Sequence, residues 1–324
     1  MTLLDELGYM LTDPLMQRAL VAALLVGLTA PIVGTYLVQR KLSLLGDGIG
    51  HVALTGVALG WLVGAGMGLV PQDALAIPGA VIAAVIGSVA IELVRERGQT
   101  SGDVALALLF YGGIAGGVLL IGIAGGSQAN LMTYLFGSIS TVTLADLVLT
   151  TVLAVIVLAV GLGLRAALFT VSQDEEFAIA SGLPVRFLNI AIAVVAALTV
   201  TVAMRVVGLL LVSALMIVPV AVAQLVTRSF SRTMAVAAVV GVTVCVVGLS
   251  ITYWYNWSPG ATIVVLAILT YGLVAAIRPL VVRRRTPHDP HPDIPDDVQV
   301  AGTPRPHGTA ATASAAGEDD PCSA

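Results

Sequence analysis

Two residues, Asp47 and His51, carry the side chains in this sequence that are best suited to chemistry. Both lie in RKLSLLGDGIGHVALTGVALG, residues 40–60, and no other histidine precedes His288. Because their spacing is one helical turn, an α-helix places them on one face. A carboxylate oxygen and an imidazole nitrogen suit a divalent transition metal such as Zn²⁺ or Mn²⁺. The spacing therefore predicts an open metal site that holds a transported ion weakly enough to release it.

A structural interpretation of the same pair stays open. Asp47 could cap the second apolar helix at its N-terminus, and His51 could be a packing histidine inside that helix. Two ligands are also too few for a closed structural metal site. In the metal interpretation, water, backbone carbonyls or a second copy of the chain would complete the coordination.

The longest polar connection, residues 165–186, is the second candidate site. Its sequence, RAALFTVSQDEEFAIASGLPVR, combines consecutive acids with a short apolar stretch. We expect a short helix over about 177–183, ended by Gly182 and stopped by Pro184. Such a helix fits the docking of a soluble partner, because acids disfavour the alternative of a helix resting on anionic lipid. The residues assigned to this segment are Asp174, Glu175, Glu176, Phe177, Ala180, Gly182, Leu183 and Pro184.

The composition indicates what kind of fold must position these residues. Of 324 residues, 58% are hydrophobic and 10% are charged, and the mean hydropathy is +1.00. Soluble domains carry about 25% charged residues, so a soluble enzyme is excluded. The net charge of −4 excludes a nucleic-acid binder, and the distant Cys245 and Cys322 exclude a disulfide framework. The chain is predicted to be an all-α polytopic membrane protein.

Nine segments reach the roughly 20 apolar residues that a membrane-spanning helix needs. The sixth and seventh are separated only at Met204–Arg205, so eight spans, with one of this pair short or re-entrant, is the alternative count. The predicted spans are approximately 18–39, 48–70, 75–94, 103–124, 144–164, 187–204, 206–227, 233–254 and 260–280.

Glycines spaced by four residues predict close packing between some of these helices. Small residues at this spacing let helix backbones approach each other inside a membrane. The pattern therefore concerns architecture rather than chemistry. The glycines concerned are Gly56, Gly60 and Gly64 in the second span, and Gly112, Gly113, Gly116 and Gly117 in the fourth.

The distribution of Lys and Arg predicts the orientation in the plasma (inner) membrane. Loops 71–74, 125–143 and 255–259 contain neither residue type, which assigns them to the outside. The N-terminus is then outside and the C-terminus cytoplasmic, with Arg18 and Arg205 as exceptions. The residues on the cytoplasmic side are Arg40, Lys41, Arg95, Arg97, Arg165, Arg186, Arg228, Arg232, Arg278, Arg283, Arg284 and Arg285.

The end of the chain differs in character from the rest. Residues 1–285 form the predicted membrane domain, whereas residues 286–324 are rich in Pro and Ala and contain no aromatic residue. Such a segment lacks the side chains for a core. We expect it to be a disordered cytoplasmic tail.

The same segments resemble the permease subunits of the zinc/manganese ABC importer family over roughly residues 15–282. LVQRKLSLLGDGIGHVALTGVALG resembles the signature of that family's second span. FAIASGLPVRFLNI resembles its ATPase-coupling loop, and MRVVGLLLVSALMIVPVAVAQLVTRS its following signature. YLFGSISTVTLADL and SPGATIVVLAILTYGL are similar to its mid-chain segment and final span. The iron-chelate and cobalamin permeases are more distant relatives with a related bundle.

The resemblance implies roles for both candidate sites and for several partners. Asp47 and His51 handle the metal in the translocation path, and the loop around Asp174–Leu183 contacts the ATPase. Two copies of the chain pair around a central path, each above an ATPase subunit, and an extracellular metal-binding protein delivers the ion. Zinc or manganese is the cargo, and no permanently bound cofactor is expected.

Three other functions were weighed against this one. An ion-coupled secondary transporter would need acidic relays beyond Asp47, whereas Glu92, Asp103 and Asp146 lie near span ends. An iron-chelate permease would have an extra N-terminal span and a large ligand cavity. A membrane enzyme would need a nucleophile–base pair, and the sequence carries no such motif. It also lacks a nucleotide-binding P-loop, so ATP hydrolysis is assigned to another chain.

Overall fold

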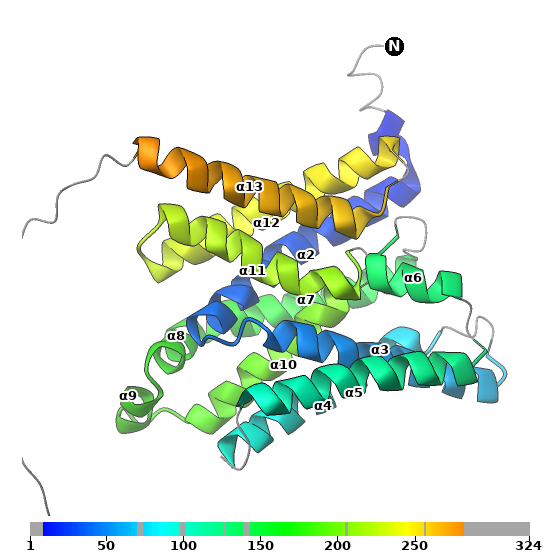
Figure 1. Cartoon of the computed structure of the whole chain (residues 1–324), viewed down its shortest axis with the longest axis horizontal. Helices are drawn as coiled ribbons and strands as arrows, with labels where there is room; N and C mark the ends of the chain where they lie inside the picture. Colours follow the sequence, from blue (N-terminus) through cyan, green and yellow to red (C-terminus); the bar gives the residue numbers. More distant parts are fainter. Residues whose placement is uncertain are drawn as a thin grey trace, which may run out of the picture. The chain divides into compact units, whose positions relative to one another are not determined.

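The computed structural model describes residues 9–69, 74–97, 102–125, 128–138, 143–204, 207–255 and 257–281. All regular secondary structure in these ranges is helical. The chain divides into two units, Met1–Val281 and Val282–Ala324. The predicted tail, residues 286–324, lies outside the described residues, so the account below concerns the helical unit (Figure 1).

Eight helices in the described ranges are long and apolar enough to cross a membrane, which confirms the all-α polytopic class. Among the described residues, the count agrees with the predicted alternative of eight spans, in which one of the sixth and seventh segments is short. The segment 206–227 forms a shorter apolar helix, α11, that begins after a turn at Gly208 with φ +87°. The eight are α2 (Pro14–Gln39), α3 (Leu45–Gly66), α4 (Ala76–Glu96), α5 (Gly102–Ile123), α7 (Leu144–Gly163), α10 (Val185–Ala203), α12 (Phe230–Trp254) and α13 (Pro259–Val281).

Four shorter helices complete the described fold. These are α6 (Gln128–Phe136), α8 (Arg165–Gln173), α9 (Glu175–Ala180) and α11 (Leu209–Val226). The sequence predicts only a loop where α6 lies. The hydroxyl of Ser258 donates a hydrogen bond to the carbonyl of Phe136 at 3.2 Å. A contact with a segment far away in the sequence therefore holds the end of α6. The residues of α6 themselves do not predict this contact.

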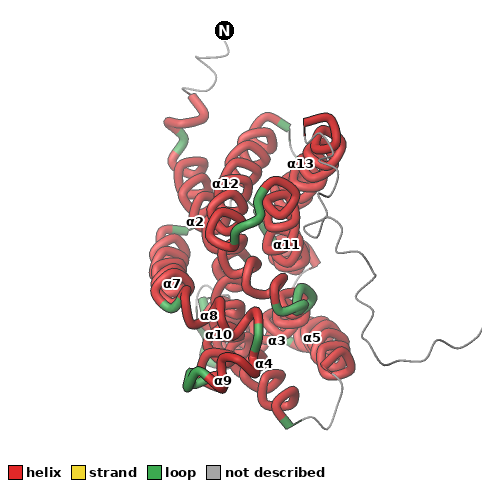
Figure 2. The backbone as a smooth tube through the Cα atoms, turned by 90° about the vertical axis from the view of Figure 1, so that its left-hand side faces the viewer, coloured by secondary structure: helices red, strands yellow, loops and turns green. Residues whose placement is uncertain are grey.

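The buried share of each long helix shows which helices form the core. In α2 and α10, 72% of the most apolar 18-residue window is buried, against 17% in α5 and α13. Figure 2 shows α5, α7 and α13 at the edge of the bundle. Because lipid can cover an apolar helix face as well as protein can, the exposed apolar faces of the outer helices suit a multi-pass membrane protein.

Glycines bring α3 close to both of its neighbours, α4 and α5, as their spacing predicts. A Cβ atom added at Gly113 of α5 would lie 2.6 Å from the carbonyl carbon of His51. Gly56, Gly60 and Gly117 also face neighbouring helices at distances that leave no room for a side chain. The prediction is wrong for Gly112, because nothing in the described chain lies within 4 Å of an added Cβ atom there.

The basic residues gather at one end of the bundle. Figure 1 shows the C-terminal ends of α2, α4, α11 and α13 and the beginnings of α10 and α12 on its left side. We call this the basic end, and define it by Arg40, Lys41, Arg95, Arg97, Arg165, Arg186, Arg228, Arg232 and Arg278. The short helices α8 and α9 lie at the same end.

Candidate functional site

The structure brings Asp47 and His51 together at the start of α3. Nε2 of His51 lies 3.8 Å from Oδ1 of Asp47, and their side chains are 4% and 28% exposed. Their predicted position on one helix face is therefore confirmed. The alternative that Asp47 caps the helix is wrong, because α3 begins at Leu45 without a side-chain cap and Asp47 lies inside the first turn.

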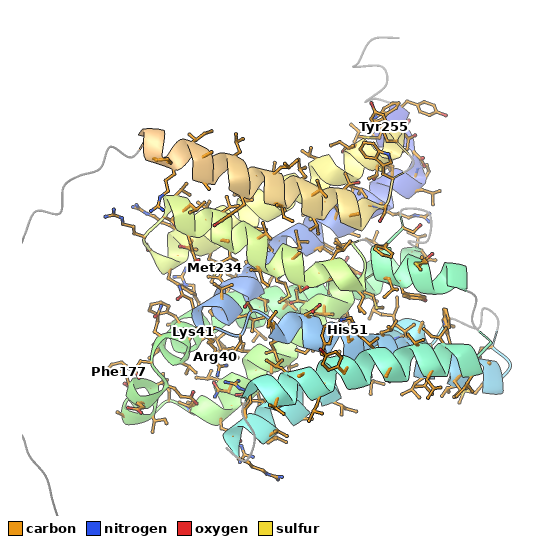
Figure 3. All side chains as sticks on the ribbon, viewed as in Figure 1. Arg40, Lys41, His51, Phe177, Met234 and Tyr255 are labelled. Atoms are coloured by element: carbon orange, nitrogen blue, oxygen red, sulfur yellow. The ribbon has the colours of Figure 1, made fainter. Side chains whose placement is uncertain are left out.

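Side chains from two other helices surround this pair. The ring of Phe110 in α5 meets the imidazole of His51 edge-on, with 4.4 Å between centroids. The hydroxyl of Ser213 in α11 donates a hydrogen bond to Oδ1 of Asp47 at 3.3 Å. The site therefore lies where α3, α5 and α11 meet, and Figure 3 labels His51 on α3 beside α5.

The hydrogen-bonding capacity of the pair is only partly used. Nδ1 of His51 is buried without a hydrogen-bond partner in the described structure, and a buried polar atom of this kind needs an explanation. Oδ1 of Asp47 accepts from Ser213 near the upper limit of a hydrogen bond. Both side chains can therefore still coordinate a metal ion.

A pocket of about 370 Å³ opens beside Asp47. Asp47 and Tyr111 are the lining residues with polar groups in their side chains, and the other lining residues are apolar. The carboxylate therefore has access to a space between α3 and α5 that could admit a small ion. The pocket is lined by Leu44, Asp47, Gly48, Leu106, Ala107, Phe110 and Tyr111.

Within the residues that the structure describes, no cluster of three or more His, Cys, Asp or Glu side chains could hold a metal ion. Asp47 and His51 offer two side-chain atoms that could coordinate an ion, and their role as metal ligands stays a prediction. Two ligand atoms leave coordination positions open for water or for ligands from outside this chain, which favours release over permanent binding.

The segment that the sequence predicts to dock a partner forms α9 rather than the helix expected over 177–183. α9 begins two residues earlier, at Glu175, because Asp174 accepts a hydrogen bond from the backbone N–H of Phe177 at 2.9 Å and caps the helix. It ends at Ala180, and Gly182 takes φ +76° in the turn that follows. This conformation suits glycine and closes the helix.

α9 presents apolar side chains outward at the basic end. Phe177 is 61% and Ile179 is 62% exposed, whereas Ala178 is buried. Oε1 of Glu175 accepts a hydrogen bond from the side chain of Asn189 in α10 at 3.0 Å. The helix is therefore tied to the bundle on one side and bare on the other, as Figure 3 shows for Phe177.

Sequence reasoning missed Ser213 and Phe110 as neighbours of the pair. Ser213 had a usable signal, because a polar residue inside an apolar span needs a reason. Phe110 had none, since an aromatic residue in an apolar helix is ordinary. Both come from helices far from Asp47 in the sequence, so only the fold brings them to the site.

Comparison with known proteins gives one consistent result. The model of the ABC 3 transport family matches residues 12–278. The chain is 31% identical to the manganese transport system membrane protein MntC of Halalkalibacterium halodurans, over 82% of this chain and 87% of that protein. It is 31% identical to the chelated iron transport system membrane protein YfeD of Yersinia pestis, over 85% and 90%. The solved structure of PsaBC from Streptococcus pneumoniae in complex with Fab covers 84% of this chain and 95% of its own, with 29% identity and a TM-score of 0.74.

Proposed function

Because the chain belongs to the ABC 3 transport family, we propose that it is the permease of an ATP-driven importer of manganese or zinc. A separate ATPase subunit supplies the energy. The observation that carries the proposal is the Asp47–His51 pair, which offers an oxygen and a nitrogen ligand on one helix face. Manganese transport by the relative MntC supports manganese as the first cargo to test.

The geometry of the pair suits a bridging ion. Metal–ligand bonds of about 2.1 Å at a tetrahedral angle place two ligand atoms about 3.4 Å apart. Nε2 of His51 and Oδ1 of Asp47 are 3.8 Å apart, so a small side-chain rotation lets one ion contact both. Asp47 supplies the charge that attracts the ion, and the open coordination positions let the ion leave.

The basic end is the cytoplasmic end in this proposal. Lys and Arg are enriched in the cytoplasmic loops of membrane proteins, and the basic residues of the described helices gather there. The N-terminus is then outside. α9 consequently lies on the side where ATP is available, and its exposed Phe177 and Ile179 form the contact with the ATPase.

Two further partners complete the importer. A second copy of the chain pairs with the first around a central path. This proposal is supported by the pocket beside Asp47, which is lined by α3 and α5, and by the low burial of α5 within one chain. An extracellular metal-binding protein delivers the ion to the opposite end. Lipid surrounds the outer helices.

Uptake by the purified importer tests the metal site. The permease, its ATPase and the binding protein are reconstituted in vesicles, and Mn²⁺ and Zn²⁺ uptake is measured with ATP hydrolysis. We expect Asp47→Asn and His51→Gln to lower uptake at least tenfold while the complex still assembles. Glu96→Gln, a carboxylate change at a surface ion pair, serves as the matched control. Uptake at the unmodified rate in both site variants would refute the assignment of Asp47 and His51 as metal ligands.

Complex assembly tests the docking helix. Phe177→Ala should lower retention of the ATPase on the immobilised permease, because the aromatic ring is exposed on α9. Trp257→Ala is the matched control, since Trp257 is 60% exposed and lies just before α13, outside the segment that resembles the ATPase-coupling loop. Equal retention in the two variants would locate the ATPase contact elsewhere.

A second candidate cargo is iron, which the relative YfeD favours by its description as a chelated iron transport protein. Carboxylate and imidazole ligands also accept Fe²⁺. Competition separates the candidates: excess Mn²⁺ or Zn²⁺ suppresses iron uptake only if the ions share the Asp47–His51 site. An iron chelate would be taken up without suppression.

A further inference from the structure

A buried group of charges lies at the basic end, next to the turn that precedes Asp47. Nη2 of Arg40 is 3.8 Å from Oε1 of Glu92, and the two side chains are 5% and 3% exposed. Oε2 of Glu92 also accepts a hydrogen bond from Nη1 of Arg95 at 2.9 Å. Removing charges from water is unfavourable unless they are well paired, so this arrangement needs a reason beyond packing.

On one side, this group is connected to α9 through α10. Glu175, the first residue of α9, accepts a hydrogen bond from Asn189 of α10, which is itself only 3% exposed. α10 packs on α4, the helix that carries Glu92. α9 is therefore connected to the Arg40–Glu92 pair through α10 and α4.

On the other side, Arg40 is joined to Asp47 by a short and closely bonded turn. The N–H groups of Lys41 and Leu42 donate to the carbonyls of Val38 and Leu37 at 3.1 Å and 2.8 Å. This is a Schellman closure, in which Lys41 takes φ +58°. The N–H of Leu45 then donates to the carbonyl of Leu42 at 3.0 Å, and α3 begins. A displacement of Arg40 is thus passed on to the first turn of α3.

We propose that the Arg40–Glu92 pair is a positioning element that transmits movement of the ATPase-docking helix α9 to the carboxylate of Asp47. The proposal rests on the proposed function of α9 and of the metal pair. A shift of Asp47 by a fraction of an ångström is sufficient, because its bond from Ser213 is already long at 3.3 Å. In Figure 3, Arg40 and Lys41 lie between Phe177 and His51.

A nearby ion pair provides a natural control. Nε of Arg186 in α10 is 3.0 Å from Oε2 of Glu96, which lies one helical turn after Glu92 in α4. Its side chains are 70% and 26% exposed, so water screens the interaction. A pair in that position adds little to the transmission of movement.

The test measures metal ions imported per ATP hydrolysed by the reconstituted importer. Arg40→Met with Glu92→Met replaces the pair by apolar side chains of similar volume, a change that often leaves a fold intact. We expect the ratio of Mn²⁺ imported to ATP hydrolysed to fall at least tenfold. Direct Mn²⁺ binding by the isolated permease should stay within twofold, because Asp47 and His51 are unchanged. Glu96→Gln, which breaks this exposed pair from the α4 side, should leave the ratio unchanged.

Glu92→Gln gives an independent measurement if the double variant does not assemble. An unchanged ratio in any assembled variant would overturn the proposal, and so would failure of both variants to assemble with the ATPase, since the pair would then be structural. Absence of Mn²⁺ uptake by the unmodified importer would refute the proposed cargo instead. The two failures are therefore distinguishable.

Discussion

Replacing Gly113 by alanine disturbs the candidate metal site without touching a ligand. An alanine Cβ atom at this position of α5 would lie 2.6 Å from the carbonyl carbon of His51 and 2.7 Å from the nitrogen of Val52. Both are backbone atoms of α3 and cannot rotate away. An ordinary carbon–carbon contact of about 3.5 Å then requires α5 to move outward by up to about 0.9 Å.

The expected loss of stability follows from that displacement. Overpacking of this kind costs about 1–3 kcal/mol. The hydroxyl of Thr55 also donates a hydrogen bond to the carbonyl of Gly113 at 2.8 Å, and bonds between membrane helices average about 0.6 kcal/mol. Alanine recovers up to about 1 kcal/mol of helix propensity. The balance is a loss of about 0.6–2.6 kcal/mol, and Phe110 moves away from the ring of His51.

Thermal unfolding in detergent and Mn²⁺ uptake check this prediction. Gly113→Ala should lower the midpoint of unfolding by a few degrees and reduce uptake. Gly112→Ala introduces the same methyl group one residue earlier, where nothing described lies within 4 Å, and should leave the midpoint unchanged or raise it. Equal midpoints for the two variants would refute the close approach of α5 to α3 at His51.

Three smaller changes test other parts of the structure. Lys41→Gly should raise the free energy of unfolding by about 0.5–1 kcal/mol, because glycine accepts the positive φ of +58°. Lys41→Ala should not raise it. Thermal unfolding compares the two variants. Thr143→Ala removes half of the capping box of α7 and should lower stability by about 1 kcal/mol in the same assay. Ser213→Ala removes the hydrogen bond to Asp47 and should weaken direct Mn²⁺ binding by about tenfold; Ser250→Ala, whose hydroxyl bonds only within its own helix, should not.

The spans could be predicted from hydropathy because each one depends on its own composition. Their boundaries could not, as the second span shows. The sequence predicts a start at residue 48, but α3 begins at Leu45. Gly46 and Gly48 disfavour a helix locally, and the turn at Lys41 together with packing against α11 and α5 overrides that preference. Tertiary contact decides where this helix begins.

In the candidate site, too, local features could be predicted from the sequence and long-range contacts could not. The Asp47–His51 pair could be predicted because one turn of helix contains both residues. The hydrogen bond from Ser213 to Asp47 joins residues 166 positions apart, and no spacing rule reaches that far. The Arg40–Glu92 pair was missed for a related reason, since each residue lies at the end of its own span and is expected to face water. In the folded chain, Arg40 and Glu92 instead pair across α2 and α4 and are buried.

Ionisable residues buried in a membrane helix need separate reasons, because each costs about 2.5–3.5 kcal/mol when charged at the bilayer centre. Among the described residues, the buried residues of this kind include His51, Glu92 and Asp146. Asp146 serves the fold, since it forms the capping box of α7. His51 and Glu92 make no such cap, and the turn between α2 and α3 separates the groups around them. We propose that His51 and Glu92 are retained because they act on the two sides of this turn, in the transmission of movement from α9 to the metal pair. A permease that only needed stability could replace both residues by apolar side chains.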